Sequence, residues 1–496
     1  MAIQHYHLPI NPPREICCFC PYFVGSHYIL QTITNMKLTT TAAFLLITLL
    51  SFGQDRVHRI DSLLHALYAK KKINGNFLIA EKGKVIYSHS FGLANEATKD
   101  TLNANSIFEL ASCSKQFTAM AIMMLKEKGK LDLDNPISQY IPELSYYKGV
   151  TVRNLLNHTG GLPDYMELMD SLFDKTRIAT NKDMIALFGK HHPKPLFEPN
   201  TKYEYSNTGY ALLASIIEKA SGLSYADYLA KSIFRPLQMT SSFVYTRRLS
   251  PRKVDNYAYG YVYSDSLKKY VLPDDLKETS MVVWLDGIVG DGCVNSTVND
   301  LLKWDRALYT NTLLSAAGMK QVFETATIKD GSRTDYGFGW AIENNADFGK
   351  LTSHSGGWPG YLTYIDRHVD NDRTIIILQN HEAVTVPIKT IRNLLYNKVM
   401  PLPKQRTAIT LTTAQLEELV GTYTIQEGMD LNISLNKEQL FVQLTGQDPL
   451  PLFAESSSAL FLKVVDAQLQ VERDGKGMIT HLFLLQNGNK IKAVRK

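Results

Sequence analysis

The 496-residue chain has little cysteine and no marked excess of charge of either sign. Five cysteines in a chain of this length are too few for a disulfide scaffold. The 53 basic and 48 acidic residues leave a net charge of only +5. Lysine and arginine form no dense block, so we expect no nucleic-acid partner. With 45% hydrophobic and 20% charged residues, the composition excludes a disordered, collagen-like or coiled-coil chain.

Long apolar runs are also lacking. The segment from Ala42 to Leu50 is too short to cross a membrane as a helix, which takes about 20 residues. Lys37 precedes it, and Ser51 and Gly53 place small residues at the −3 and −1 positions of a cut before residue 54. This is the pattern of a secretory signal peptide. We therefore expect an exported protein, periplasmic or extracellular, with no stable membrane anchor.

Residues 1–35 precede this segment and show neither helical nor strand periodicity. Because a signal peptide begins at the N-terminus, we expect translation to start at Met36 and residues 1–53 to be absent from the mature chain. Three of the five cysteines would leave with this leader: Cys17, Cys18 and Cys20. The mature chain would keep only Cys113 and Cys293, with no disulfide framework.

The hydrophobic pattern after the leader predicts a sheet that is interrupted by helices. Residues 55–72 have a helical period, and Phe77–Ala80 and Val85–Phe91 form a predicted hairpin. The stretch 107–310 is mostly helical or loop. Strand character then returns at Gly360–Arg367 and Thr374–Gln379. Strands at both ends predict the α+β class, with one antiparallel sheet flanked by helices and a mostly helical region inserted into its sequence.

The length predicts two units, because a single core stops growing at roughly 250–300 residues. The proline-containing stretch Met400–Lys404 is interpreted as a linker. We expect a large domain at residues 54–400, and a linker with a small all-β domain or barrel at 401–496. Five short alternating runs predict strands in the second domain: Leu431–Leu435, Gln439–Leu444, Ala459–Val465, Gln468–Glu472 and Thr480–Leu485.

Ser112 and Lys115 open a segment, residues 116–128, that is apolar on nearly every face, which is typical of a buried helix. Residues three apart share one helix face, so the Lys115 amine is expected beside the Ser112 hydroxyl. A serine becomes a nucleophile when a base takes its proton, and a desolvated lysine amine can serve. The same Ser-x-x-Lys spelling occurs at Ser145 and Ser266, but neither opens a buried helix.

Tyr205 and Asn207 directly precede a second predicted helix, residues 208–220. A tyrosine at such a junction can project into a cleft, where the asparagine side chain donates and accepts hydrogen bonds. A phenol becomes a useful base when a cation such as Lys115 lies beside it. The stretch Tyr309-Thr-Asn311 has the same spelling, and either tyrosine taken alone is more simply a packed aromatic residue.

His354 begins a third element, at the start of the late strand pair. The glycines that follow it, Gly356 and Gly357, permit close approach of the backbone to a ligand. The stretch His158-Thr-Gly160 has the same spelling, but it follows a helix end and is interpreted as a turn. The three elements, in this order and each in a suitable local setting, predict one catalytic site.

Together these motifs resemble those of the serine β-lactamase and penicillin-binding-protein superfamily, in particular the D-peptidase-like branch of the class C β-lactamase-like serine hydrolases. The resemblance covers residues 55–395 and includes the stretches Phe108–Ser112, Leu155–Pro163 and His354–Gly360. It implies a β-lactamase/transpeptidase-like fold. The C-terminal β domain resembles accessory domains that are appended to some members.

By this resemblance, Ser112 would attack a carbonyl group and form an acyl-enzyme, while Lys115 and Tyr205 would share the proton transfers. The backbone N–H groups of Ser112 and Gly357 would form the oxyanion hole. The substrate would be held by Asn207, Ser355 and Gly356. The resemblance implies no metal and no cofactor, and no His, Cys or Asp cluster in the sequence has zinc spacing.

His354, counted among the catalytic residues, stands where β-lactamases have lysine. An imidazole is a smaller and only partly charged anchor at neutral pH, which weakens the expected recognition of a β-lactam carboxylate. By the resemblance, histidine at this position is found in the D-peptidase-like branch, which favours peptide or ester substrates. We therefore expect a D-amino-acid peptidase or carboxypeptidase, with an esterase or a β-lactamase as alternatives. A non-catalytic relative that binds cell-wall peptides, and an adhesion protein with fortuitous motifs, are the remaining hypotheses.

Overall fold

The computed structural model describes residues 55–382, 385–398, 406–426, 428–445, 449–462, 467–486 and 489–496. The expected leader, signal peptide and linker lie outside these residues. The chain divides into two units between residues 398 and 399, each with its own hydrophobic core.

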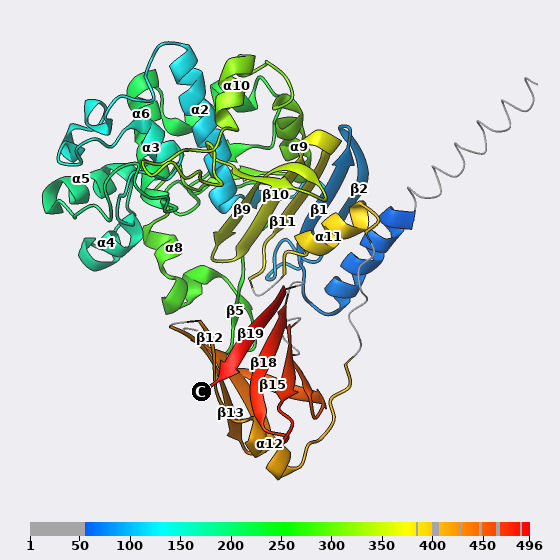
Figure 1. Ribbon diagram of the computed structural model, residues 1–496. Coiled ribbons are helices and arrows are strands. Elements are labelled where there is room, and N and C mark those ends of the chain that lie inside the picture. The colour runs from blue at the N-terminus through cyan, green and yellow to red at the C-terminus, as the bar shows by residue number, and fades with distance from the viewer. Residues whose placement is uncertain are drawn as a thin grey trace, which may run out of the picture. The chain divides into compact units, whose positions relative to one another are not determined.

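A six-stranded antiparallel sheet forms the base of the first unit, in the order β2-β1-β11-β10-β9-β8 (Figure 1). Its centre joins strands from the two ends of the unit, because β1 pairs with β11 along its whole length. Nearly every residue of these two strands is buried, so the sheet is covered on both faces. The strands are β1 (Gly75–Glu81), β2 (Lys84–Phe91), β8 (Ala341–Asn345), β9 (Gly349–Trp358), β10 (Tyr361–His368) and β11 (Arg373–Gln379).

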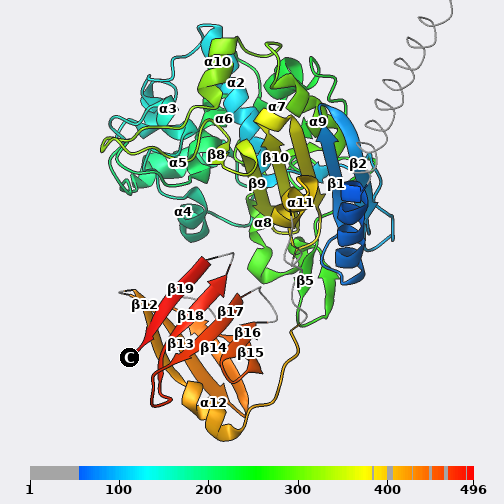
Figure 2. The same cartoon turned by 45° about the vertical axis from the view of Figure 1, so that its right-hand side comes forward.

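The side chains of β1 alternate between two hydrophobic cores, as the two-residue period of a strand requires. Phe77 and Ile79 pack under the helix at residues 55–69 and under α11 (Ile388–Leu395). Leu78 and Ala80 point to the opposite face, into the core of the helical region. Figure 2 shows helices on both faces of the sheet.

The helical region is inserted between β2 and β8. At its centre lies α2 (Lys115–Glu127), in which every residue from Lys115 to Leu125 is buried. Two small sheets, β3-β7-β4 and β5-β6, complete the region. The other helices are α3 (Val152–Leu156), α4 (Tyr165–Leu172), α5 (Asn181–His191), α6 (Asn207–Ser221), α7 (Tyr225–Leu229), α8 (Met281–Trp284), α9 (Val298–Ala307) and α10 (Ala316–Val322). The short strands are β3 (Phe108–Glu109), β4 (Phe243–Val244), β5 (Val262–Ser264), β6 (Lys269–Val271) and β7 (Val294–Ser296).

The second unit is a closed antiparallel barrel, in which β12 pairs with β19 to complete the ring. A short helix, α12 (Thr413–Leu419), contributes Leu416 and Leu419 to the barrel core. The strands are β12 (Gly421–Gln426), β13 (Met429–Asn436), β14 (Gln439–Leu444), β15 (Leu450–Ser456), β16 (Ala459–Leu462), β17 (Ala467–Arg473), β18 (Ile479–Gln486) and β19 (Asn489–Arg495).

The predicted fold class is confirmed, but two details of the prediction were wrong. Strand structure returns at Ala341, earlier than the predicted Gly360, and His354 lies within β9 instead of at the start of a strand pair. The sequence of β9 is rich in glycine, serine and polar residues, and tertiary pairing with β8 and β10 makes it a strand. In the barrel, the five predicted strands are present, with residues 463–465 outside the described part, and β12, β15 and β19 were missed.

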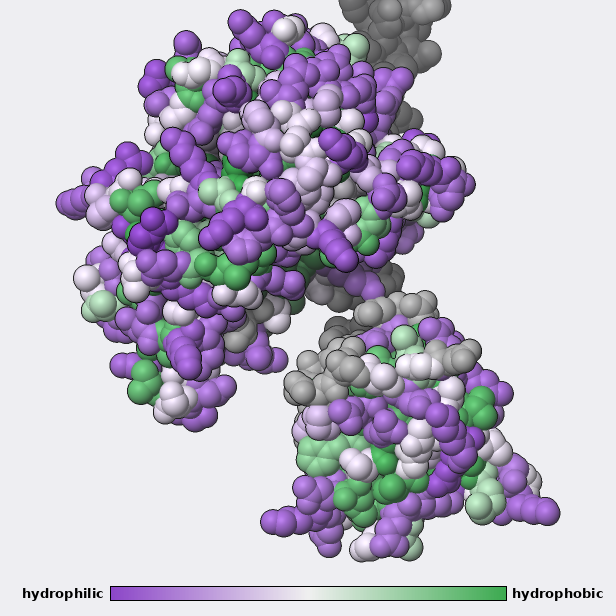
Figure 3. Space-filling view, turned by 90° about the vertical axis from the view of Figure 1, so that its left-hand side faces the viewer, coloured by the Kyte–Doolittle hydropathy of each residue, from purple (hydrophilic) through white to green (hydrophobic). Residues whose placement is uncertain are grey.

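The surface gives little sign of a broad apolar face. On the side of the molecule shown in Figure 3, hydrophilic residues predominate and hydrophobic ones gather only in small patches. Within the described residues, no helix combines the length and the apolar character that crossing a membrane requires.

Candidate active site

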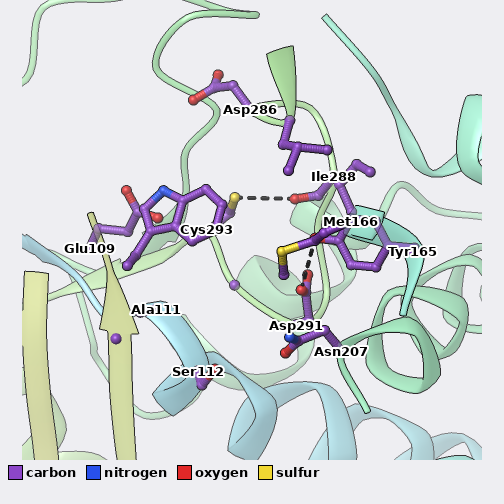
Figure 4. A pocket seen from close by; sticks show the side chains of 14 residues that line it. Glu109, Ala111, Ser112, Tyr165, Met166, Asn207, Asp286, Ile288, Asp291 and Cys293 are labelled. Atoms are coloured by element: carbon purple, nitrogen blue, oxygen red, sulfur yellow. Dashed lines mark hydrogen bonds between the residues drawn. The ribbon is translucent and has the colours of Figure 1, made fainter. Parts of the chain in front are cut away.

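Ser112 stands at a strained turn between a strand and a buried helix. It belongs to a short 3₁₀ helix (Ala111–Ser114) that follows β3 and continues into α2. Ala111 has a φ of 48°, in the left-handed region, which costs a residue with a Cβ about 1–2 kcal/mol. Strain of this kind persists where the surrounding structure imposes it. Here the turn brings the Ser112 side chain to the wall of a cavity (Figure 4).

Lys115 is fully buried, and its ammonium group is held by three acceptors. Lys115 Nζ donates to Ser112 Oγ at 3.0 Å, to Asn207 Oδ1 at 2.9 Å and to the backbone oxygen of Asp291 at 2.9 Å. An ammonium group has three donors, so all of them are used. The lysine therefore has one fixed position, with one of its three hydrogen bonds directed at the serine hydroxyl.

Tyr205 and Asn207 come from the loop that enters α6. The Ser206 side chain caps this helix by accepting the backbone N–H of Gly209. The Tyr205 ring is 40% exposed, and its centroid lies 5.0 Å from Lys115 Nζ. Among the described residues, no group forms a hydrogen bond with the Tyr205 hydroxyl, which leaves that hydroxyl available to a bound molecule.

His354 is buried within β9. Its Nδ1 donates to the backbone oxygen of Ser355 at 2.6 Å, so the neutral ring accepts at Nε2 from the Tyr336 hydroxyl at 2.8 Å. Burial, and next the charge of Lys115, lower the pKa of His354 to about 3. An imidazole in this state offers no positive charge at neutral pH.

The strand that carries His354 lies against the turn of the nucleophile. A Cβ at Gly356 would lie 2.3 Å from the backbone oxygen of Leu110, so only glycine fits there. A Cβ at Gly357 would meet nothing within 4 Å, because this residue faces the cavity. Ser355, between His354 and Gly356, is exposed.

A cavity lies beside Ser112. Of the predicted site residues, Ser112, Asn207 and Gly357 line it, while Lys115 lies buried behind Ser112. Tyr205, His354, Ser355 and Gly356 are not part of its wall. Its apolar side chains include Met166, Leu285, Ile288 and Trp358, and its carboxylates are Glu109, Asp286 and Asp291 (Figure 4).

His158, which the sequence suggested to be part of a simple turn, lies beside the predicted site. Its Nδ1 accepts the backbone N–H of Ser206 at 3.0 Å, and its ring centroid lies 4.4 Å from that of Tyr205. Its φ of 61° turns the chain toward the Tyr205 loop. The sequence could have pointed to this residue, because residues 158–160 have the same His-x-Gly pattern as the His354 motif.

Tyr336 is a second residue near the site that the sequence analysis did not identify. It packs against His158 with ring centroids 4.6 Å apart and hydrogen-bonds to His354, so it joins the two histidines. No motif marks this tyrosine in the sequence. Within the described ranges, no group of three or more His, Cys, Asp or Glu side chains is placed to hold a metal ion.

Comparison with known proteins agrees with this geometry. The family model Beta-lactamase matches residues 60–396, and a domain of unknown function, DUF3471, matches residues 405–493. The chain is 42% identical to penicillin-binding protein 4* of Bacillus subtilis over 89% of its own length and 99% of that protein. It is 27% identical to the putative penicillin-binding protein PbpX of the same organism, over 69% of this chain and 78% of that one.

Two solved structures share the fold. The octameric penicillin-binding protein homologue from Pyrococcus abyssi superposes with a TM-score of 0.62 at 24% identity, covering 88% of this chain and 99% of that one. The D-amino acid amidase from Ochrobactrum anthropi superposes with a TM-score of 0.53 at 24% identity, covering 66% of this chain and 94% of that one. The predicted resemblance to the serine β-lactamase and penicillin-binding-protein superfamily is thereby confirmed, and the chain belongs to the β-lactamase family of serine hydrolases.

Proposed function

We propose that the protein is an exported hydrolase that cleaves amide or ester bonds through an acyl-Ser112 intermediate, with D-amino-acid peptides or amides as preferred substrates. The observation that carries this proposal is the 3.0 Å contact between Lys115 Nζ and Ser112 Oγ. Ser112 also lines a cavity, together with Asn207 and Gly357. We assign catalysis to residues 54–400 and leave residues 401–496 as an accessory unit.

In the proposed reaction, Ser112 Oγ attacks the substrate carbonyl carbon. Its proton passes either to Tyr205 as the phenolate, or to Lys115 as the neutral amine, in which form the lysine accepts from Ser112 Oγ instead of donating to it. The N–H groups of Ser112 and Gly357 stabilise the oxyanion, and one such donor contributes about 3–4 kcal/mol. The leaving amine or alcohol departs with a proton from the same pair. A water then attacks the acyl carbon, and Ser112 recovers its proton.

The neutral state of His354 bears on the substrate. A carboxylate on the substrate, such as that of a β-lactam, would find no positive charge at this residue. We therefore rank β-lactamase activity below peptidase, amidase and esterase activity. The name of one similar structure, D-amino acid amidase, agrees with the amide substrates in this ranking.

Export rests on the signal-peptide pattern at residues 36–53. N-terminal sequencing of the protein secreted by its native host is expected to give a chain that begins at Gln54. A mature chain that begins earlier would contradict export by this signal.

Covalent labelling tests the proposed chemistry. The purified protein is incubated with a fluorophosphonate and, separately, with benzylpenicillin, and the adduct is located by peptide mapping with mass spectrometry. We expect one adduct, on Ser112. An adduct on another residue would refute the assignment of the nucleophile, and no adduct with either reagent would favour the non-catalytic peptide-binding alternative.

Replacing His158 by alanine is expected to lower kcat by about 10–100-fold, since a misplacement of 1 Å at a reacting group can cost about 100-fold. The change removes the ring that packs against Tyr205 and the acceptor for Ser206 N–H. Asparagine is the matched variant, because it keeps an acceptor and tolerates a positive φ. Steady-state kinetics on an ester substrate should show partial recovery in His158→Asn. Equal kcat in wild type and His158→Ala would exclude a positioning role.

A further inference from the structure

Three carboxylates line the cavity beside Ser112, and two of them have donors of their own. Asp286 Oδ1 accepts from Arg248 Nη1 at 2.9 Å, and its Oδ2 accepts the backbone N–H groups of Arg248 and Leu249. Asp291 Oδ2 accepts from the Tyr165 hydroxyl at 3.1 Å (Figure 4). Both side chains are therefore fixed parts of the wall.

Glu109 differs from these two carboxylates. It lines the same cavity, and within the described residues no hydrogen bond or ion pair reaches its carboxylate. The two nearby arginines do not supply one, because Arg247 and Arg248 both donate to Asp274, and Arg248 also pairs with Asp286.

Within the described residues no ion pair is formed by Glu109 itself, although the charges of Arg248 and Arg247 act on its carboxylate from nearby. The positive charges of Arg247 and Arg248 are balanced by their partners Asp274 and Asp286. The remaining cation is the Lys115 ammonium, and the charge of Lys115 acts on the buried carboxylate of Asp291. One carboxylate, that of Glu109, is then left over on the wall of a cavity that contains the nucleophile.

We propose that Glu109 binds a free ammonium group on the acyl part of the substrate, so that the enzyme acts on aminoacyl amides, aminoacyl esters or peptides with an unblocked amino terminus. This inference rests on the proposed function of Ser112. Glu109 precedes Ser112 by three residues, so their Cα atoms lie at most about 11 Å apart. Glu109 and Ser112 line the same cavity, so a residue acylated on Ser112 shares that cavity with the Glu109 side chain.

The rest of the wall fits such a substrate. Trp358 lines the cavity and offers an aromatic face, which attracts an ammonium group. Met166, Leu285 and Ile288 supply apolar surface for an amino-acid side chain. Among the described residues, no metal-binding group of three ligands includes Glu109, which makes a metal ion a poorer occupant than an amine.

The protonation of Glu109 supports the same assignment. Burial raises the pKa of Glu109 to about 7 against the opposing charge of Arg248. Folding raises the pKa of this carboxyl group above its value of about 4.3 in the unfolded chain. The folded state therefore loses stability as the pH rises from that value through the pKa of the folded state. At pH 8 the ionised Glu109 therefore lowers the stability of the folded protein. This is expected if the ammonium group that pairs with it belongs to the substrate.

The test compares D-alanine p-nitroanilide with its N-acetyl derivative, using the full chain. We expect the wild type to prefer the free amine in kcat/KM by about 10–100-fold, the equivalent of a hydrogen bond between charged groups. In Glu109→Gln this ratio should fall to near one. Glu343→Gln, on an exposed site of β8, is the matched control and should keep the wild-type ratio.

Thermal unfolding supplies a second measurement. The Glu109→Gln variant should have a higher Tm than the wild type at pH 8 and no advantage at pH 4.5. A lower Tm at both pH values would show a purely structural glutamate and overturn the inference. An unchanged substrate ratio in Glu109→Gln, or a wild-type preference for the acetylated substrate, would also overturn it. Absence of turnover and of Ser112 labelling in the wild type would instead refute the proposed function.

Discussion

Replacing Ser112 by alanine is expected to abolish acylation and to lower kcat/KM for amide and ester substrates by at least about 10⁴-fold. Loss of the serine nucleophile costs an unrelated serine protease about 10⁶-fold in kcat, and binding with oxyanion stabilisation leaves a small remainder. The change removes a single oxygen, Oγ, which accepts one of the hydrogen bonds of Lys115. Labelling by a fluorophosphonate and hydrolysis of a chromogenic ester measure the two effects.

The chain offers a matched control in Ser145, which begins another Ser-x-x-Lys sequence and is exposed on the surface. Ser145→Ala should label and turn over like the wild type. The Tm of Ser112→Ala should remain close to that of the wild type, because the deleted hydroxyl faces a cavity and fills no part of the core. A Ser112→Ala protein that is still labelled at the wild-type rate would place the nucleophile elsewhere.

The sequence predicted those parts of the site that local structure determines. Ser112 and Lys115 are neighbours because a turn of helix separates residues three apart, and their helix is buried because it is apolar on nearly every face. Asn207 enters the site because Ser206 begins a helix there. Such features depend on a few adjacent residues and can be recognised from them.

The sequence did not predict what arises from contacts between distant segments. Lys115 bonds to the backbone of Asp291, which is 176 residues away, and Tyr336 meets His354 through a loop that no motif marks. The lowered pKa of His354 has the same kind of origin, since its burial comes from the packing of β9 against neighbouring elements. Burial of this kind depends on contacts between distant segments, which a short sequence motif does not determine.

The two histidine motifs show most directly what a short sequence pattern cannot predict. His354 and His158 belong to similar triplets, and both lie next to the Tyr205 ring, with centroids 6.1 and 4.4 Å away. One lies on a strand and the other at a turn with a positive φ. Treating the second as a simple turn was correct for its backbone but missed the place where the turn puts the side chain.

Replacing Lys115 by methionine is expected to lower the rate of acylation by about 10³-fold or more, within the range for loss of a general acid–base group. Methionine keeps the length of the stem but provides no donor. Ser112 Oγ, Asn207 Oδ1 and the backbone oxygen of Asp291 then lose the bond that holds them together. Stopped-flow acylation by an activated ester measures the rate, and Lys148→Met, at an exposed lysine of the second Ser-x-x-Lys sequence, is the control.

The electrostatic effect of the same substitution separates proton transfer from simple misfolding. Burial is the main cause of the lowered pKa values of His158 and His354 and of the raised pKa of Asp291, and the charge of Lys115 acts next, lowering all three. Removing that charge should therefore raise the pKa values of all three groups. NMR titration of the histidine ring protons can follow the two histidines in a folded protein. If Lys115→Met shows these shifts yet acylates within tenfold of the wild type, the proton of Ser112 does not need the lysine, and Tyr205 alone receives it. If the shifts and the rate loss occur together, the buried ammonium group sets the charge of the site and takes part in the chemistry.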